Sequence, residues 1–231
     1  TDIDVTFPLD EYTTDPVLIP NADTVELSYD KRESVLRQDK LKLQDDVALD
    51  FVFNWSPAAA QCIETTGTEI DAYTDKATGK RKGICKADVL GLMTKFNNDD
   101  IPQEGRYLLL DAQMYSQLLN SLTENENTAF LASADAQNGI LGKLFRVALY
   151  TAAKAPKAWS TAGAATDLAA GLAWHEQSVC RALGEVKAFE NEGDATYYGD
   201  IYSFLVRAGG RIMREDKKGV IALVQGTPAA G

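Results

Sequence analysis

The sequence predicts an α+β fold, and three patterns along the chain carry that prediction. The N-terminal strings IDVTF and TVELSY alternate polar with apolar residues, which is the period of a half-buried strand. Further on, Leu43, Val47, Phe51 and Trp55 lie four residues apart and mark the apolar face of a helix. Near the C-terminus, the unbroken apolar run 220–224 is typical of a strand buried on both faces.

The first 30 residues predict a two-stranded ribbon with an irregular tip. Between the two alternating strings lies PLDEYTTDPVLIPNAD, which has three prolines and no helical periodicity. A lone ribbon is at best marginally stable in water, so its apolar side needs another surface, which a neighbouring copy of the chain can supply. The segment carries eight acids and no Lys or Arg, whereas KATGKRKGICK is basic. Two ordinary solvated surfaces explain these charges, and complementarity between copies is the alternative.

The middle of the chain predicts alternating helices and strands. The helix marked by Leu43 to Trp55 should end at Pro57, and KADVLGLMTKFNN should form a second amphipathic helix. RYLLLD then reads as a strand, AQMYSQLLNSL as a helix and LGKLFRVALYTAA as another strand.

The last third of the chain leaves one segment ambiguous. In residues 161–191, the spacing of Leu168, Leu172, Val179 and Leu183 fits one long helix. Gly163 and Gly171 favour instead a strand up to about Trp174 and a short helix ending at Gly184. We expect a further helix over 200–208, capped by Asp200 and stopped by Gly209, with an inner face made by Ile201, Phe204, Leu205 and Ala208. Residues 209–226 should form a hairpin that turns at Gly219.

Length and charge bound the class of protein. A chain of 231 residues with 45% hydrophobic residues can bury a core in one large or two small domains. The formal charge of −11 argues against a dedicated nucleic-acid binder, and no apolar run approaches a membrane span. The three cysteines have neither disulfide-framework nor zinc spacing, which suggests a reducing compartment. Because the chain begins at Thr1 without a Met, we expect a processed or trimmed product.

The sequence offers little catalytic chemistry. His175 is the only histidine, so a nucleophilic pair would have to use it, with Cys180 five residues on. No oxyanion-hole signature accompanies this pair, and a structural histidine is the simpler interpretation. The neighbouring carboxylates 45–46 and 99–100 read as surface pairs, and GKRKG reads as a basic turn rather than a phosphate loop. We therefore predict a protein that is not an enzyme, with no catalytic, cofactor-binding or metal-binding residues.

Several strings in a fixed order resemble a known family. IPQEGRYLLLDAQMYSQLL, LAWHEQSVCRALGEV, YYGDIYSFLVRAGG and the ending EDKKGVIALVQ, preceded by Arg211 and Arg214, are similar to major capsid proteins of tailed bacteriophages and prophages, especially those of gut Bacteroidetes hosts. The resemblance covers about Asp10 to Gly226. It implies the Hong Kong 97-like capsid fold, with an extended loop, a long spine helix, a peripheral domain and an axial domain.

The resemblance also implies a division of the chain. Residues 1–40 would be the extended loop, 41–85 and 191–231 the peripheral domain with its spine helix, and 86–190 the axial domain. In this family the extended loop lies on the adjacent subunit. The family usually carries an N-terminal arm ahead of that loop, which this chain does not show, so its assembly competence is in question.

The implied function is structural. Copies of the chain would assemble into hexamers and pentamers of an icosahedral shell that encloses phage double-stranded DNA. The implied partners are other copies, scaffolding, portal and decoration proteins, and packaged DNA through weak non-specific contact, with no membrane partner. The implied location is the virion capsid, assembled in the cytoplasm of the bacterial host. Two alternatives stay open: an encapsulin-like compartment shell, and an α/β hydrolase or transferase using His175 and Cys180.

Overall fold

The protein is described by a computed structural model over residues 7–20, 31–57, 59–138, 140–152, 165–194 and 196–228. Its contacts divide the chain into two compact units. The first unit is Thr1–Asn54 with Arg181–Arg211, and the second unit is Trp55–Cys180 with Ile212–Gly231. These boundaries differ from the division expected at residues 40, 85 and 190. Each unit is described by itself.

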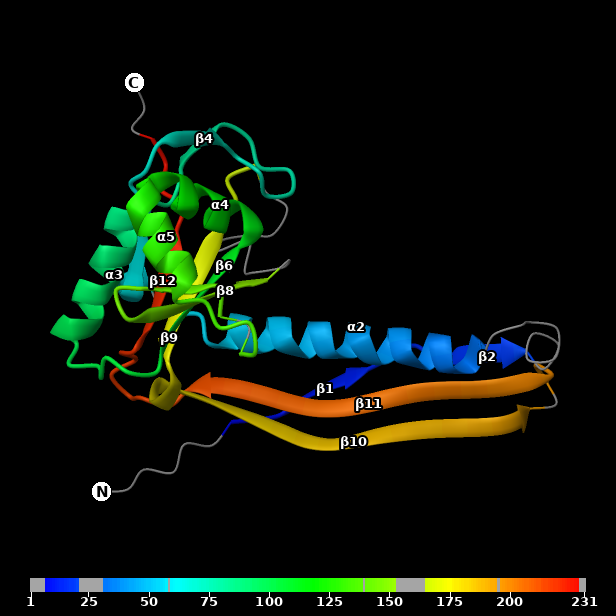
Figure 1. Ribbon diagram of the computed structural model, residues 1–231. Coiled ribbons are helices and arrows are strands. Elements are labelled where there is room, and N and C mark those ends of the chain that lie inside the picture. Colours follow the sequence, from blue (N-terminus) through cyan, green and yellow to red (C-terminus); the bar gives the residue numbers. More distant parts are fainter. Residues whose placement is uncertain are drawn as a thin grey trace, which may run out of the picture. The chain divides into compact units, whose positions relative to one another are not determined.

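The first unit is a sheet with one long helix. The helix is α2 (Lys31–Asn54), and the strands are β1 (Asp10–Thr13), β2 (Val17–Pro20), β10 (Val179–Asp194) and β11 (Gly199–Ile212), the last two reaching the second unit at one end. In the sheet, β11 lies between β10 on one side and β1 and β2 on the other (Figure 1). The pairing is antiparallel, with Asp10 opposite Ala208 and Val17 opposite Tyr202.

The helix α2 packs on β11 through the predicted apolar stripe. Leu43 and Val47 are buried against Phe204, Val206 and Ala208. The stripe confirms the predicted helix, and its end at Asn54 agrees with the helix-breaking Pro57. The helix begins earlier than the stripe indicated, at Lys31, so residues 31–40 are helical and not part of a ribbon.

The second unit is built on a six-stranded sheet in the order β3-β12-β9-β6-β8-β7. Its strands are β3 (Cys62–Glu64), β6 (Arg106–Asp111), β7 (Gly142–Leu144), β8 (Val147–Ala152), β9 (Ala170–His175) and β12 (Val220–Val224). The pairs β12–β3 and β6–β8 are parallel, and the other pairs are antiparallel. Strand β12 is buried along its whole length, as the apolar run predicted.

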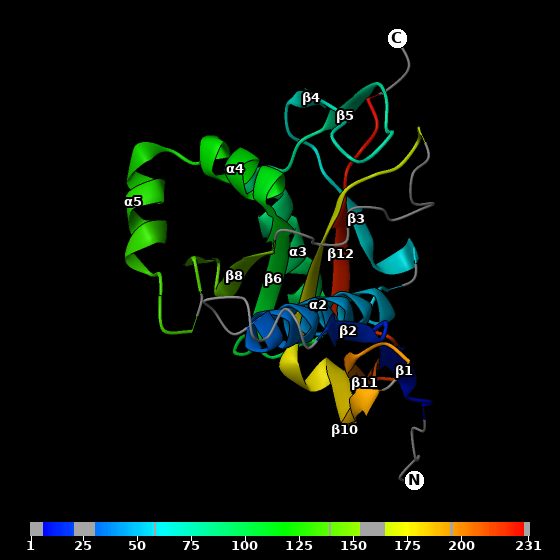
Figure 2. The ribbon, with the colours of Figure 1, turned by 90° about the vertical axis from the view of Figure 1, so that its right-hand side faces the viewer.

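Three helices cover this sheet: α3 (Lys86–Asn98), α4 (Ala112–Ser121) and α5 (Glu124–Ala132). They contact β12 and β3, β6 and β8, and β7 respectively (Figure 2). Leu92 and Phe96 of α3 and Met114 and Leu118 of α4 are fully buried in the core. The positions of α3, β6 and α4 confirm the sequence predictions, while LGKLFRVALYTAA forms two strands, β7 and β8, instead of one.

The basic string GKRKG is a strand and not a turn. Its residues Lys80–Lys82 form β5, which pairs with β4 (Glu69–Asp71) in a two-stranded sheet. Arg81 is buried, and its Nη2 donates to the backbone carbonyl of Ala165. The turn prediction was wrong because it counted Arg81 among solvated charges, whereas its two terminal guanidinium nitrogens donate to backbone carbonyls.

The helix predicted over 200–208 was wrong, because this segment belongs to strand β11. Its buried side chains are Tyr202, Phe204, Val206 and Ala208, which follow the two-residue period of a strand. Phe204 and Ala208 are four residues apart, a spacing that places them on one face of a helix and also on one face of a strand. The helical interpretation therefore included both of them. Pairing with β1, β2 and β10 decided between them.

The predictions for the two segments flanking this strand were partly wrong. A strand up to Trp174 is confirmed by β9, but the expected helix ending at Gly184 is a 3₁₀ turn, η2 (Glu176–Ser178), followed by β10. The expected hairpin at 209–226 does not form, because β11 and β12 lie in different sheets. Gly219 does have the positive φ expected of a turn, +85°.

The N-terminal strings IDVTF and TVELSY fall almost entirely outside the described residues. Between them, the segment expected to be an irregular tip contains β1 and β2, each paired with β11. Neither strand has a clear alternating pattern, so backbone pairing with β11 explains them better than side-chain periodicity.

Candidate assembly surface

The geometry around His175 speaks against a catalytic role. His175 ends β9 and is buried, with 3% of its surface exposed. Its Nε2 lies 2.9 Å from the carbonyl oxygen of Glu104, which can only accept, so Nε2 carries the proton. Its Nδ1 accepts from the backbone N–H of Gln177 at 3.2 Å. Both ring nitrogens are therefore engaged with backbone, and neither is placed to take a proton from the thiol of Cys180.

The neighbouring carboxylates at 45–46 and 99–100 do not form a site either. Asp45 and Asp46 are exposed on α2, as expected of a surface pair. Asp99 is less exposed than predicted, and its carboxylate lies 3.4 Å from Lys218 Nζ. Within the described ranges, no group of three His, Cys, Asp or Glu side chains could hold a metal ion, and no helix is long and apolar enough to cross a bilayer.

The most distinctive surface of the first unit is an apolar groove beside α2, which we call the α2–β10 groove. It has a volume of about 480 Å³ and lies over the sheet next to the helix. Its lining residues come from three elements: Lys40, Leu43, Gln44, Val47, Ala48 and Phe51 of α2, Arg181, Leu183, Val186 and Ala188 of β10, and Phe204 and Val206 of β11. The groove forms because one helix covers β11 but leaves β10 open.

Strand β10 gives this groove an exposed apolar wall. Leu183 and Val186 line the groove, and their exposed fractions are 65% and 59%. In the described sheet β10 is an edge strand, since only β11 pairs with it. A long edge strand with large apolar side chains is a template for another chain, and apolar patches of this kind mark interaction sites.

Charges stand at the rim of the groove. Lys40 and Arg181 line it, and the ammonium of Lys40 lies 5.4 Å from the centre of the Phe204 ring. Nearby in the same unit, burial and a hydrogen bond to Asp50 raise the pKa of Tyr12, so its phenol stays neutral. The groove thus offers apolar walls with basic groups at its edge, which suits an acidic, partly apolar segment.

Sequence reasoning missed this groove, because residues 179–184 were read as a short helix. The groove-facing residues of β10 change from odd numbers, 181 and 183, to even numbers, 186 and 188. A change of this kind is typical of a β-bulge and breaks the alternation that would have revealed the strand. The string CRALGEVKAF also fits an amphipathic helix, since Arg181 and Glu185 stand four residues apart, so the sequence did not distinguish the strand from a helix.

Comparison with solved structures identifies the fold of the chain. No protein-family model and no curated protein sequence matches the chain. Solved structures do match: a chain from Mycobacterium phage Che8 aligns with a TM-score of 0.64 at 16% identity, over 93% of this chain and 70% of that one. The capsid of cyanophage P-SCSP1u aligns at 0.62 and 17% identity, over 96% and 77%. A virus-like particle from Pyrococcus furiosus aligns at 0.57 and 9% identity, over 94% and 76%.

The chain has the Hong Kong 97-like capsid fold. The alignments cover nearly all of the chain, so both compact units are part of this fold.

Proposed function

We propose that this protein is a phage major capsid protein that assembles with other copies of itself into a shell. The observation that carries the proposal is the match of more than 90% of the chain to structures from phage particles. The exposed apolar wall of β10 supports it, because such a surface favours association with another chain over a monomeric state.

The finer parts of the proposal rest on the family resemblance. Copies would form hexamers and pentamers of an icosahedral shell around double-stranded phage DNA, in a virion of the Bacteroidetes-phage type assembled in the host cytoplasm. The net charge of −11 suits a shell whose inner surface contacts DNA weakly and without sequence preference. Scaffolding, portal and decoration proteins are further proposed partners, and the protein is proposed not to be an enzyme.

The proposed roles of the chain segments follow the same resemblance. Residues 1–40 would be the extended loop, 41–85 with 191–231 the peripheral domain with its spine helix, and 86–190 the axial domain. The compact units divide at residues 54, 180 and 211 instead. We propose that the α2–β10 groove receives residues 21–30 of an adjacent copy, because Lys40 and Arg181 in its lining complement the acids of those residues. The preceding strands β1 and β2 pair with β11 of their own chain.

Electron microscopy of assembly tests this proposal. The protein, expressed in a bacterial host, should form closed uniform shells. The double variant Leu183→Ser/Val186→Ser removes the exposed wall of the groove and should leave folded protein that does not close shells. The control Leu90→Ser/Leu131→Ser changes exposed leucines of the second unit and should still assemble. Shells formed by the groove variant at wild-type yield would refute the role of the groove.

An encapsulin-like compartment is the second candidate. The alignment with the virus-like particle from Pyrococcus furiosus favours it, since this fold is not restricted to phage heads. The nucleic-acid content of purified shells separates the two. Packaged double-stranded DNA supports the capsid proposal, and protein cargo without DNA supports the compartment.

A further inference from the structure

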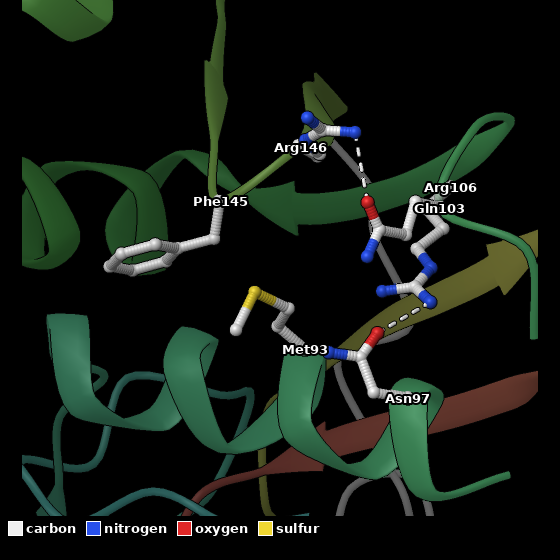
Figure 3. A pocket seen from close by; sticks show the side chains of 6 residues that line it. All are labelled: Met93, Asn97, Gln103, Arg106, Phe145 and Arg146. Atoms are coloured by element: carbon white, nitrogen blue, oxygen red, sulfur yellow. Dashed lines mark hydrogen bonds between the residues drawn. The ribbon is translucent and has the colours of Figure 1, made fainter. Parts of the chain in front are cut away.

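The second unit contains a pocket that the assembly surface does not use. Its volume is about 450 Å³, and its lining residues come from α3, from the segment before β6, from the start of β6 and from the β7–β8 turn: Met93, Asn97, Gln103, Arg106, Phe145 and Arg146. Figure 3 shows two arginine side chains above a floor formed by α3, with Met93 and Phe145 on the other side of the space. Two cations, two amides and two apolar side chains line it, and no acid does.

Arg106 is buried without a carboxylate partner. Only 2% of its surface is exposed, yet its acceptors are backbone and amide oxygens. Its Nε donates to Pro102 O at 2.8 Å, and its Nη2 donates to Asn97 Oδ1 at 2.9 Å and to Ile101 O. The remaining nitrogen, Nη1, is buried with no hydrogen-bond partner among the described residues, and Figure 3 shows a guanidinium nitrogen directed into the pocket.

The charge of Arg106 is therefore compensated only in part, by carbonyl and amide oxygens and by the Phe96 ring, whose centre lies 5.1 Å from its Cζ. Burial lowers the pKa of Arg106, and no acidic side chain acts to raise it. Arginine nevertheless stays protonated in proteins, so a full positive charge faces the pocket, with one guanidinium nitrogen that lacks a hydrogen-bond acceptor. A buried donor without a partner costs free energy, and an oxygen ligand at Nη1 would recover that cost.

The second cation comes from a strained turn. Phe145 and Arg146 have φ values of +48° and +64°, and they are the two loop residues between the paired Leu144 and Val147. Such two-residue turns favour Asn and Gly, so Phe and Arg are unfavourable choices for the backbone. The turn holds the Arg146 guanidinium at the pocket, where its Nη1 donates to Gln103 Oε1 at 2.8 Å (Figure 3).

We propose that this pocket binds a carboxylate carried on a short apolar stem, as in a glutamate side chain. One carboxylate oxygen would bind Arg106 Nη1, and the other would replace Gln103 Oε1 on Arg146, while the stem lies between Met93 and Phe145. A carboxylate fits better than a DNA phosphate, because the walls opposite the arginines are apolar and a chain of charge −11 repels a polyanion. That a second copy supplies this carboxylate rests on the proposed assembly function; the pocket itself does not.

The first test uses the isolated chain and therefore does not depend on assembly. Sodium propionate is titrated into protein labelled with ¹⁵N-arginine at an ionic strength held constant with sodium chloride, and the arginine side-chain NMR signals are followed. The Arg106 signals should shift with saturation. Arg146→Gln should weaken propionate binding by roughly tenfold, since it removes one charged hydrogen bond. Arg37→Gln, which removes an exposed charge from α2, should leave the affinity unchanged.

The second test builds the ligand into the chain. Gln103→Glu places a carboxylate beside Arg146 and should abolish the effect of propionate, whereas Gln113→Glu adds the same charge at an exposed position of α4 and should preserve it. Equal loss of affinity in Arg37→Gln and Arg146→Gln would overturn the proposal, because it would indicate general charge attraction. Inorganic phosphate binding more tightly than propionate would overturn it in favour of a phosphate site. Failure of these titrations leaves shell assembly untouched, so the two proposals fail separately.

Discussion

The phenol of Tyr73 donates a hydrogen bond to Asp111 Oδ2 at 2.8 Å. The other oxygen of the same carboxylate, Oδ1, accepts from the backbone N–H of Met114 at 2.7 Å and so caps α4. Asp111 is 3% exposed and is also the last residue of β6. One buried carboxylate therefore joins the loop after β4, the central strand β6 and the start of α4, which explains how the second unit fixes this helix on its sheet.

We expect Asp111→Ala to destabilise the protein by about 2–3 kcal/mol, because it removes the helix cap and leaves Tyr73 without its acceptor. Tyr73→Phe should cost only about 1 kcal/mol, since it deletes one hydrogen bond and keeps the cap. Urea unfolding followed by circular dichroism measures both. Equal losses in the two variants would contradict the role of Asp111 as the cap.

Asp88 should be a second sensitive carboxylate of this unit. It is 3% exposed, and it accepts from Cys85 N at 2.8 Å and from the Thr66 hydroxyl at 2.6 Å. Asp88→Ala leaves both donors without an acceptor near the start of α3, so we expect the free energy of unfolding to fall by about 3 kcal/mol. Asp88→Asn keeps one acceptor oxygen and should lose less. The same unfolding experiment tests this order, and a reversed order would show that the charge itself is unfavourable.

Acid sensitivity should arise in part at the start of α5. The hydrogen bond from Lys86, followed by those from Thr123, lowers the pKa of Glu126 to about 2 from an ordinary value of 4.5. The folded state therefore holds this group ionised while the unfolded state takes up a proton. The stabilisation is present above about pH 4.5 and is lost as the pH falls to about 2.

Glu126→Gln should flatten the fall of the urea midpoint between these two pH values. Glu124→Gln removes the same charge from the same helical turn and serves as the control, because the Lys86 contact remains. An unchanged pH profile in Glu126→Gln would assign the acid sensitivity to other groups, of which Asp216 is the first candidate. The hydrogen bond from Arg214 lowers the pKa of Asp216 to about 2 as well.

Much of the second unit could be predicted because its elements are locally consistent. The spacing of Val89, Leu92 and Phe96 gave α3 correctly, and the apolar run of β12 gave a strand buried on both faces. Its partners were not predictable, because β12 pairs with β3 and β9, which are far away in sequence. The hairpin expected with β11 failed for this reason.

The first unit and its groove were harder to predict. Strand β11 contains Phe204 and Ala208, which are spaced for a helix as well as for a strand, and only pairing with β1, β2 and β10 separates the two periods. The pocket at Arg106 had no sequence signal either. Its two arginines belong to β6 and to the β7–β8 turn, and neither stands in a motif.

Gly219 should be intolerant of any side chain, for two separable reasons. Its φ is +85°, and a Cβ at this position would clash with Ser178 Oγ. Its carbonyl accepts from His175 N at 2.9 Å, so the turn cannot move away without losing the junction with β9.

We expect Gly219→Ala to lower the free energy of unfolding by about 2–4 kcal/mol, from backbone strain and from displacement of Ser178. Adding Ser178→Gly should remove the steric part alone, so the cost of Gly219→Ala in that background should fall to about 1–2 kcal/mol. Urea unfolding of the four proteins in this double-mutant cycle measures the difference, and strictly additive losses would show that Ser178 does not restrict the turn.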